Sequence, residues 1–308
     1  MSTPEIDAGP GGEVTNSVAR CNCECTEAGG FCEFTVEPAT AAQPGVQGGL
    51  GHPAVTTVGR VGELVHCSVD GGVATITLDS PANRNALSRQ LVGELHDALD
   101  RAEQPDVRVI VLTHTGPTFC AGADLKERST TPADSTPMAR AIERLGTSAA
   151  PTIAVVNGSV RAGGVGIMAA CDLVVVARAV TFAFTEVRIG VAPAIISVPI
   201  LARCGWSKLA GPFLTGETFD TATAKDMGLV THVTDDVVDT VDRLLAGVLA
   251  GAPGAVAATK RVLRQSQPNM ADMQALSEAL FQSAEAAEGM RAFAEKRTPS
   301  WAARKDEA

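Results

Sequence analysis

The chain of 308 residues lacks two features that would place it in a membrane or in the secretory route. No apolar run reaches the length of a transmembrane helix. The first thirty residues contain one basic side chain, Arg20, and no apolar segment of the kind found in a signal peptide. From these absences we expect a cytoplasmic protein without a membrane partner.

An excess of basic residues is also missing. The chain has 25 Lys and Arg against 35 Asp and Glu, which gives a net charge of −10. Proteins that bind nucleic acid neutralise phosphates with basic patches, so this balance argues against nucleic acid as the main partner. A small ligand that carries phosphate is still compatible, because a few local basic side chains suffice to bind it.

The eight cysteines do not form a disulfide framework or a recognisable metal motif. Cys21, Cys23, Cys25 and Cys32 cluster near the start, but paired C-x2-C spacing and a companion group of histidines are absent. An unstructured tail is favoured over a thiolate metal site, and we expect no metal. The other four cysteines stand singly among apolar or small residues, where a buried, reduced thiol is expected; they are Cys67, Cys120, Cys171 and Cys204.

The hydrophobic content of 45% is enough for one substantial core. Residues 1–58 are rich in Gly, Pro, Thr and Glu and show no helix or strand period, so we expect a disordered leader. Beyond it, β-branched runs at 64–69 and 73–78 flank a Gly-containing turn and predict a β-hairpin. Ser88 then precedes a helical apolar pattern.

Strand and helix patterns alternate through the middle of the chain, which predicts an α/β core. Strands are expected at 107–112, 151–156, 172–177 and 181–184, with a short helix at 138–145. From Ala194 onward the pattern is mainly helical, with helices expected at 207–215, 221–227, 237–249, 256–265 and 270–288.

Two turns rich in small residues follow predicted strands and open into helices. They are 119–126 (FCAGADLK) and 156–164 (VNGSVRAGG). Such turns expose backbone N–H groups, and two of them side by side can hold the negative charge of an oxyanion. After the first turn, residues 127–135 have several Thr, Pro and Ser residues, which suits a loop beside a ligand site.

A set of motifs that follow one another in order resembles the crotonase, or enoyl-CoA hydratase/isomerase, superfamily. The matching segments lie between about residues 60 and 300: 78–81, 83–88, 119–126, 157–164, 171–174, 184–190, 214–217, 224–230 and 293–297. Each segment is a weak signal by itself, whereas the ordered set is specific.

The resemblance implies a crotonase-like spiral of ββα units over 59–250 and a C-terminal helical trimerisation region over 251–308. The expected assembly is a homotrimer or a dimer of trimers. The ligand would be an acyl-CoA or enoyl-CoA thioester, with no cofactor, since coenzyme A is part of the substrate. By position, the N–H groups of Ala123 and Gly163 would form the oxyanion hole for the thioester carbonyl.

The resemblance also assigns residues around the coenzyme A moiety. Ala121, Asp124, Leu125 and Lys126 belong to the matching turn, with Lys126 near the adenine and phosphate end. Lys296 would reach the same ligand from a neighbouring subunit. Without the resemblance, a lysine in such a position is a solvated surface charge.

Glu186 is the candidate acid or base. Its neighbours in 182–187 (FAFTEV) are apolar enough to raise its pKa, as proton transfer at the thioester α-carbon requires. The alternative is an exposed glutamate or one in an ion pair, for which Arg188 is a candidate partner. The resemblance aligns Glu186 with the carboxylate that handles the Cα proton.

The sequence departs from the two-glutamate hydratases at the second carboxylate. That glutamate lies three residues after the oxyanion glycine, where this chain has Gly166. The glycine-rich turn common after the first carboxylate is replaced by 191–198 (VAPAIISV). This pattern resembles the single-glutamate branch that includes bacterial 3-methylglutaconyl-CoA hydratase-like proteins.

Three functions follow as hypotheses. The first is an enoyl-CoA hydratase-like lyase that uses the oxyanion hole and Glu186. The second is a Δ3-Δ2 enoyl-CoA isomerase, in which one carboxylate moves one proton and a second glutamate is not needed. The third, from a different class, is a non-catalytic acyl-CoA-binding protein that keeps the fold.

Overall fold

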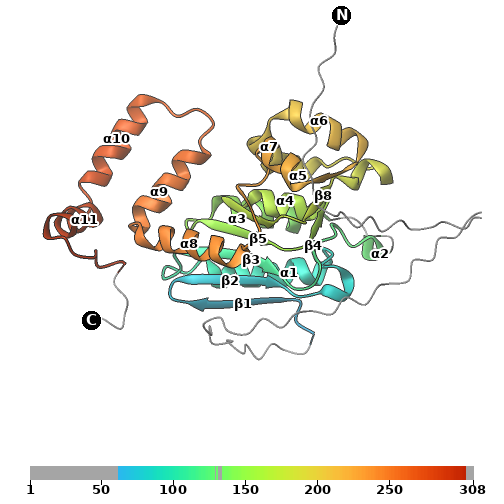
Figure 1. The fold of residues 1–308 in the computed structure, drawn as a ribbon, viewed down its shortest axis with the longest axis horizontal. Coiled ribbons are helices and arrows are strands. Elements are labelled where there is room, and N and C mark those ends of the chain that lie inside the picture. Colours follow the sequence, from blue (N-terminus) through green and yellow to red (C-terminus); the bar gives the residue numbers. More distant parts are fainter. Residues whose placement is uncertain (1–61, 129, 131–133, 303–308) are drawn as a thin grey trace, which may run out of the picture. The chain divides into compact units, whose positions relative to one another are not determined.

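The computed structural model describes residues 62–128, 130 and 134–302, so the leader predicted at 1–58 lies outside the described residues. The larger sheet has six strands in the order β1-β2-β3-β5-β7-β10 (Figure 1). The hairpin prediction is confirmed, because β1 and β2 pair antiparallel. The other neighbours in this sheet are parallel; the strands are β1 (Val65–Asp70), β2 (Val73–Leu78), β3 (Val109–His114), β5 (Thr152–Val156), β7 (Leu173–Ala177) and β10 (His232–Thr234).

The smaller sheet consists of three-residue strands in the order β4-β6-β8-β9. These are β4 (Thr118–Cys120), β6 (Ser159–Arg161), β8 (Thr181–Ala183) and β9 (Thr218–Asp220). Only β8 was predicted, because three residues are too few to show a period of two. The chain visits the two sheets in turn, β3 then β4, β5 then β6, and β7 then β8, which is the spiral expected from the sequence.

Strands separate most of the helices up to α8, and the helices from α8 onward follow one another directly. They are α1 (Arg89–Ala102), α2 (Leu125–Arg128), α3 (Thr136–Thr147), α4 (Gly163–Ala170), α5 (Ala194–Cys204), α6 (Trp206–Thr215), α7 (Thr221–Met227), α8 (Val237–Ala250), α9 (Pro253–Arg264), α10 (Met270–Phe281) and α11 (Ala284–Glu295), with 3-10 turns η1 (Pro81–Asn83) and η2 (Thr185–Ile189). Ser88 caps α1 as predicted, since its Oγ accepts the Leu91 N–H at 3.2 Å.

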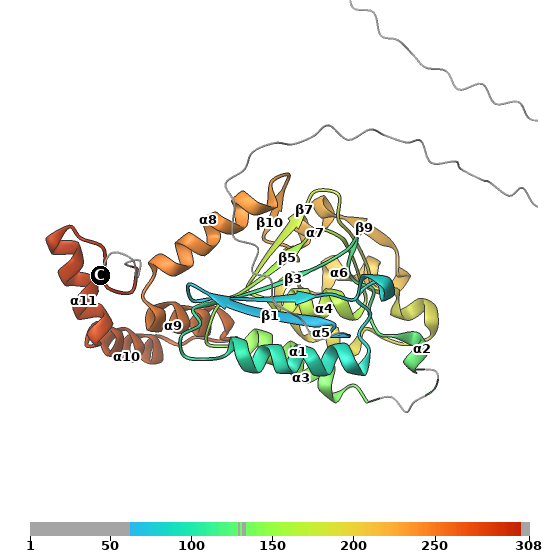
Figure 2. The same ribbon diagram turned by 90° about the horizontal axis from the view of Figure 1, so that it is seen from below.

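The central strands of the larger sheet, β3, β5 and β7, are buried on both faces, which explains their uninterrupted apolar runs. Ile110 and Leu112 of β3 belong to the main core, which also contains the inner face of α1. Val109 and Val111 point to the other face and pack in a second cluster with residues of α8. Figure 2 shows the sheet between α1 and α3 on one side and α8 on the other.

The prediction of one helix over 270–288 was wrong. α10 ends at Phe281 and α11 begins at Ala284. Ser283 interrupts the helix because its side chain accepts the Ala286 N–H at 3.1 Å, and a serine that caps a new helix start competes with continuation of the old one.

A buried ion pair fastens α9 to the core. Lys260 donates to Asp172 Oδ2 at 2.8 Å and to the carbonyl of Ala150 at 3.0 Å. Arg264, one turn further along α9, binds the other oxygen of Asp172 at 2.6 Å. The first C-terminal helix is thereby part of the core, whereas α10 and α11 extend beyond it in both views (Figures 1 and 2).

In the described part of the chain, no single helix is long and apolar enough to cross a membrane. The pair α8 and α9 meets the length and composition criteria only when its two members are taken together, and it is bent by 111°.

Candidate active site

Three consecutive turns of the spiral bring the predicted catalytic positions to one edge of the smaller sheet. β4, β6 and β8 lie side by side and parallel. Ala123 follows β4 by three residues, Gly163 follows β6 by two, and Glu186 follows β8 by three. Because carboxyl ends of parallel strands meet at the same edge of a sheet, these positions are brought together although they span more than sixty residues of sequence.

The backbone N–H of Ala123 has no hydrogen-bond partner in the part of the chain that the structure describes. Ala123 forms an isolated parallel bridge with Leu87. The two hydrogen bonds of this bridge join Leu87 to the residues on either side of Ala123. The Leu87 N–H donates to Gly122 O at 2.8 Å, and the Asp124 N–H donates to Leu87 O at 3.4 Å. In a parallel bridge, the residue between those two groups turns its own N–H away from the partner. The bridge therefore leaves the Ala123 N–H available to a ligand.

Gly163 is the first residue of α4, so its N–H has no carbonyl one turn earlier in the helix. The same position is the positive end of the helix dipole, which favours an oxyanion. The two turns are in contact: a methyl group on Gly122 would lie 3.5 Å from Gly163 N. Gly122 also has a φ of +92°, which only glycine adopts without strain.

Glu186 carries a buried carboxylate oxygen without a partner. Its side chain is half-buried in η2, and Oε2 has no hydrogen bond among the described residues. Burial raises the pKa of Glu186 above its usual 4.5, as the apolar sequence around it predicted. The alternative ion pair with Arg188 is not formed, since Arg188 Nε donates instead to the carbonyl of Thr215 at 3.2 Å.

The apolar side chain of Ile196 fills the space next to Gly166, the position where two-glutamate hydratases carry their second carboxylate. Gly166 lies in α4 against α5, and a methyl group added to it would lie 2.7 Å from Ile196 Cβ. Ile196 is 4% exposed and belongs to the main core. A side chain at position 166 thus requires α5 to move. The sequence showed the glycine but not its partner, because the two residues are thirty positions apart on separate helices.

The residues assigned to the coenzyme A moiety are only partly brought together. The Ala121 N–H donates to the Arg84 carbonyl at 3.0 Å, so it is used within the protein. Asp124 caps α2 by accepting the N–H groups of Lys126 and Glu127 at 3.0 and 3.2 Å. That capping role was not predicted, although an aspartate before a short helix is its usual signal.

Leu125 and Lys126 are exposed on α2, next to Ala123 in sequence. Lys296 lies at the C-terminal end of α11 and is also exposed. In both views α11 and α2 lie at opposite ends of the part of the chain that the structure describes (Figures 1 and 2). One chain therefore does not bring Lys296 to the other four residues, and its arrival from a neighbouring subunit stays a prediction.

Cys120 supports the first turn and was missed as a site residue. Its Sγ accepts the Gly122 N–H at 3.4 Å, and a methyl group on Gly164 would lie 2.6 Å from its Cβ. Complete burial raises the pKa of this thiol to about 12. It is therefore a neutral packing residue between the two turns, in agreement with the expectation for the scattered cysteines.

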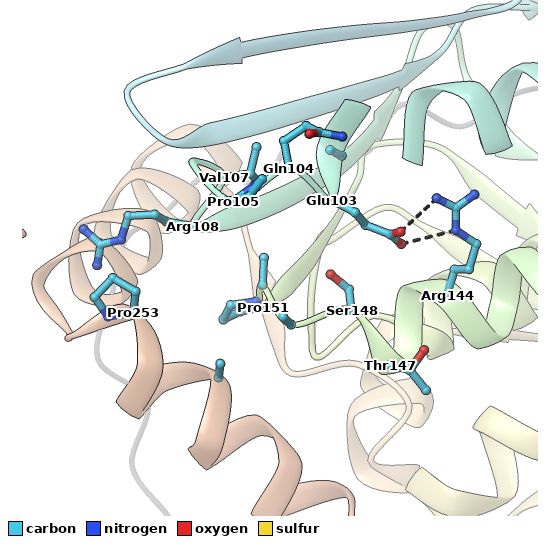
Figure 3. A pocket seen from close by; sticks show the side chains of 14 residues that line it. Glu103, Gln104, Pro105, Val107, Arg108, Arg144, Thr147, Ser148, Pro151 and Pro253 are labelled. Carbon is cyan, nitrogen blue, oxygen red and sulfur yellow. Dashed lines mark hydrogen bonds and ion pairs between the residues drawn. The ribbon is translucent and has the colours of Figure 1, made fainter. Parts of the chain in front are cut away.

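A cavity of about 430 Å³ lies elsewhere (Figure 3). Arg108 and Pro151 line it, and each immediately precedes a strand of the larger sheet, β3 and β5 respectively. The chain runs from this end of β5 through the strand and on to β6 and Gly163. The cavity is thus at the end of the sheet away from the candidate site. Among the described residues, no group of three or more His, Cys, Asp or Glu side chains is placed to hold a metal.

The sequence model of the enoyl-CoA hydratase/isomerase family matches residues 68–304. The chain belongs to this family. The match covers the spiral and all of the C-terminal helices, so the α/β fold expected from the motifs is confirmed at the level of the family.

Relatives within the enoyl-CoA hydratase/isomerase family differ in the reaction they are named for. The crystal structure of an enoyl-CoA hydratase from Mycobacterium avium is 41% identical, covers 77% of this chain and 98% of its own, and has a TM-score of 0.60. A mevalonyl-coenzyme A hydratase of Aspergillus fumigatus is 33% identical over 247 residues, 74% of this chain and 91% of the relative. A 1,2-epoxyphenylacetyl-CoA isomerase of Escherichia coli is 28% identical over 257 residues, which cover 78% of this chain and 98% of the relative.

Proposed function

We propose that this chain is an enoyl-CoA hydratase-like lyase that acts on an acyl-CoA thioester with one catalytic glutamate. The observation that carries the proposal is Glu186 Oε2, a buried carboxylate oxygen with no partner among the described residues. It follows β8 at the sheet edge where the turns after β4 and β6 also end. An unpaired buried carboxylate is costly for a fold, and such groups concentrate where chemistry needs them.

In this proposal the N–H groups of Ala123 and Gly163 bind the thioester oxygen. Charge develops on that oxygen when a nucleophile attacks the conjugated Cβ, because the electrons of the double bond move to form an enolate. Preorganised donors stabilise the enolate more than the neutral thioester, and loss of one such donor typically costs about 3–4 kcal/mol of transition-state stabilisation.

Glu186 would perform both proton transfers. Its carboxylate accepts a proton from water as the water oxygen bonds to Cβ, and the resulting carboxylic acid then gives that proton to Cα as the enolate collapses to the thioester. Burial moves the pKa of Glu186 toward neutral pH, which suits a group that must both accept and release a proton. Water supplies both the hydroxyl and the hydrogen of the product.

The absence of a second carboxylate at Gly166 supports the single-glutamate branch, which resembles 3-methylglutaconyl-CoA hydratase-like proteins. Ile196 strengthens this part of the proposal, because it occupies the space into which a side chain at 166 would extend. The same observation favours a second candidate, a Δ3-Δ2 enoyl-CoA isomerase. In that reaction one carboxylate removes a proton from Cα and returns it to Cγ, so a second carboxylate and a water are not required.

Substrate binding completes the proposal. Ala121, Asp124, Leu125 and Lys126 would line the approach of the coenzyme A moiety to the oxyanion hole, with Lys296 supplied by a neighbouring subunit of a homotrimer or a dimer of trimers. The turn and α2 position the first four, since Asp124 holds the start of α2 through two backbone N–H groups.

The deciding experiment is a panel of 2-enoyl-CoA, 3-enoyl-CoA and saturated acyl-CoA thioesters incubated in deuterated water and analysed by mass. A hydratase adds D₂O to the 2-enoyl-CoA, whereas an isomerase converts the 3-enoyl-CoA without that gain. Glu186→Gln should reduce either rate at least a hundredfold. Glu143→Gln, on the exposed face of α3, is the control and should retain the rate. Binding without deuterium uptake or turnover would show a non-catalytic protein, and full activity of Glu186→Gln would overturn the assignment.

A further inference from the structure

Ala162, the residue before Gly163, has a backbone conformation that alanine rarely adopts. Its φ is +47° and its ψ is −121°, the combination found at the first central position of a type II′ turn, where glycine is the usual residue. Arg84 and Lys296 also have positive φ, but their ψ values of 36° and 38° belong to the ordinary left-handed region. Ala162 is therefore the more strained of these residues.

The surrounding structure holds Ala162 from two sides. Its N–H donates to the carbonyl of Ala183, the last residue of β8, at 3.0 Å. Its Cβ packs against Gly122 of the first turn. A methyl group added to Gly122 would lie only 2.8 Å from the Ala162 Cβ. The preceding Arg161 is fixed as well, because its guanidinium binds the carbonyl of Thr181 at 2.6 Å.

These contacts connect Ala162 to all three parts of the candidate site. Gly163 follows it directly, Ala123 follows Gly122, and Glu186 lies three residues after Ala183. A strained conformation persists only where its neighbours determine it, and such residues cluster at functional sites. Relaxation at Ala162 would rotate the next peptide unit, which carries the Gly163 N–H.

We propose that Ala162 is a positioning residue for the oxyanion hole: its β-carbon and its bond to Ala183 keep the Gly163 N–H in register with the Ala123 N–H and with Glu186. The inference rests on the proposed function, because it assigns a role within the same site. Glycine at this position would adopt the required φ without strain but would also adopt others, and it would lose the contact with Gly122.

The test compares Ala162→Gly with Ala162→Ser, which keeps the β-carbon. Ala162→Gly should lower kcat on the order of tenfold with KM within about twofold, since a misaligned donor weakens transition-state binding more than substrate binding. Its rate of Cα hydrogen exchange in deuterated water should fall in parallel. Its Tm should not fall, because backbone strain is relieved. Ala162→Ser should recover most of the rate.

Glu143→Gln, on the exposed face of α3, is the control. It changes a side chain away from the candidate site and should leave kcat unchanged. A normal kcat in Ala162→Gly would overturn the inference. A lower kcat together with a lower Tm would also overturn it, because it would show that Ala162 only stabilises the fold. Glu186→Gln, assayed in parallel, separates the two proposals: if that variant is fully active the proposed function fails, whatever Ala162→Gly shows.

Discussion

At the scale of single residues, the candidate site is built from groups that have no protein partner among residues 62–128, 130 and 134–302. The Glu186 carboxylate oxygen, the first N–H of α4 and the N–H of Ala123 are all available to a ligand. The Glu186 oxygen costs free energy, because a buried polar group without a partner is unfavourable. Arg188, by contrast, donates from Nε to the Thr215 carbonyl and forms no ion pair with Glu186.

The cost of Glu186 predicts a pH-dependent gain of stability in Glu186→Gln. Burial raises the folded-state pKa of Glu186 above 4.5, so its stabilising contribution is present below that pH and is lost as the pH rises through the raised value. The neutral glutamine avoids this loss. We therefore expect Glu186→Gln to have a higher Tm than the parent protein at pH 7, and the difference to close below pH 4.5, as measured by calorimetry. Glu143→Gln should show no such trend, and a lower Tm for Glu186→Gln at pH 7 would contradict the expectation.

At the scale of elements, the contact between α4 and α5 determines how many carboxylates the site has. Gly166 allows the two helices to approach so closely that Ile196 fills the adjacent space. A second carboxylate at position 166 is therefore excluded by the packing of α5 as well as by the glycine itself.

This contact predicts that even a methyl group at position 166 is destabilising. Gly166→Ala should lower the free energy of unfolding by about 1–3 kcal/mol, the usual effect of overpacking, measured by urea denaturation. Gly93→Ala on α1 is the matched control, because a methyl group there meets nothing within 4 Å; it should be neutral or stabilising. Equal effects of the two substitutions would show that α5 moves freely.

The attachment of α9 gives a second prediction at this scale. Asp172→Asn leaves the buried Lys260 ammonium without its carboxylate and should cost about 3–5 kcal/mol of unfolding free energy. Asp235→Asn removes the partner of Arg178 in an ion pair whose side chains are 73% and 64% exposed, and its effect on the unfolding free energy should be far smaller. Chemical denaturation of both variants measures the difference, and a loss at Asp172 as small as that at Asp235 would show that α9 is held by other contacts.

At the scale of the whole molecule, the C-terminal helices expose large apolar side chains. Met270 is 82% exposed, Phe281 70% and Phe293 88%. Apolar surface of this kind on helices that extend from a core is typical of subunit packing. It supports the proposed homotrimer or dimer of trimers and the contribution of Lys296 to a neighbouring site.

Charged substitutions on these helices should break the assembly. The double variant Phe281→Glu and Phe293→Glu should have the mass of a monomer by light scattering, whereas Val69→Glu on the outer hairpin should keep the mass of the parent protein. Because the C-terminal region is expected to complete the ligand site, the double variant should also bind acyl-CoA more weakly. A parent protein that is monomeric at micromolar concentration would contradict the assembly.

Local sequence was sufficient for the features that depend on local chemistry. The hairpin from 65 to 78, the cap at Ser88, helix α7 and the four buried cysteines all follow from patterns within a few residues. The turns after β4 and β6 were visible as runs of small residues, whereas Glu186 was assigned by the family resemblance, and its catalytic role stays a prediction. Helix α10 was overextended, since the competing cap at Ser283 is a single weak signal.

Only the tertiary structure decided how those pieces act on one another. The three-residue strands β4 and β6 carry no period of their own, yet their parallel pairing with β8 places Ala123, Gly163 and Glu186 at one edge. The contact of Gly166 with Ile196 and the strain at Ala162 are equally invisible in sequence. Both arise from the close approach of segments distant in the chain, and a pattern along one segment contains no information about that distance.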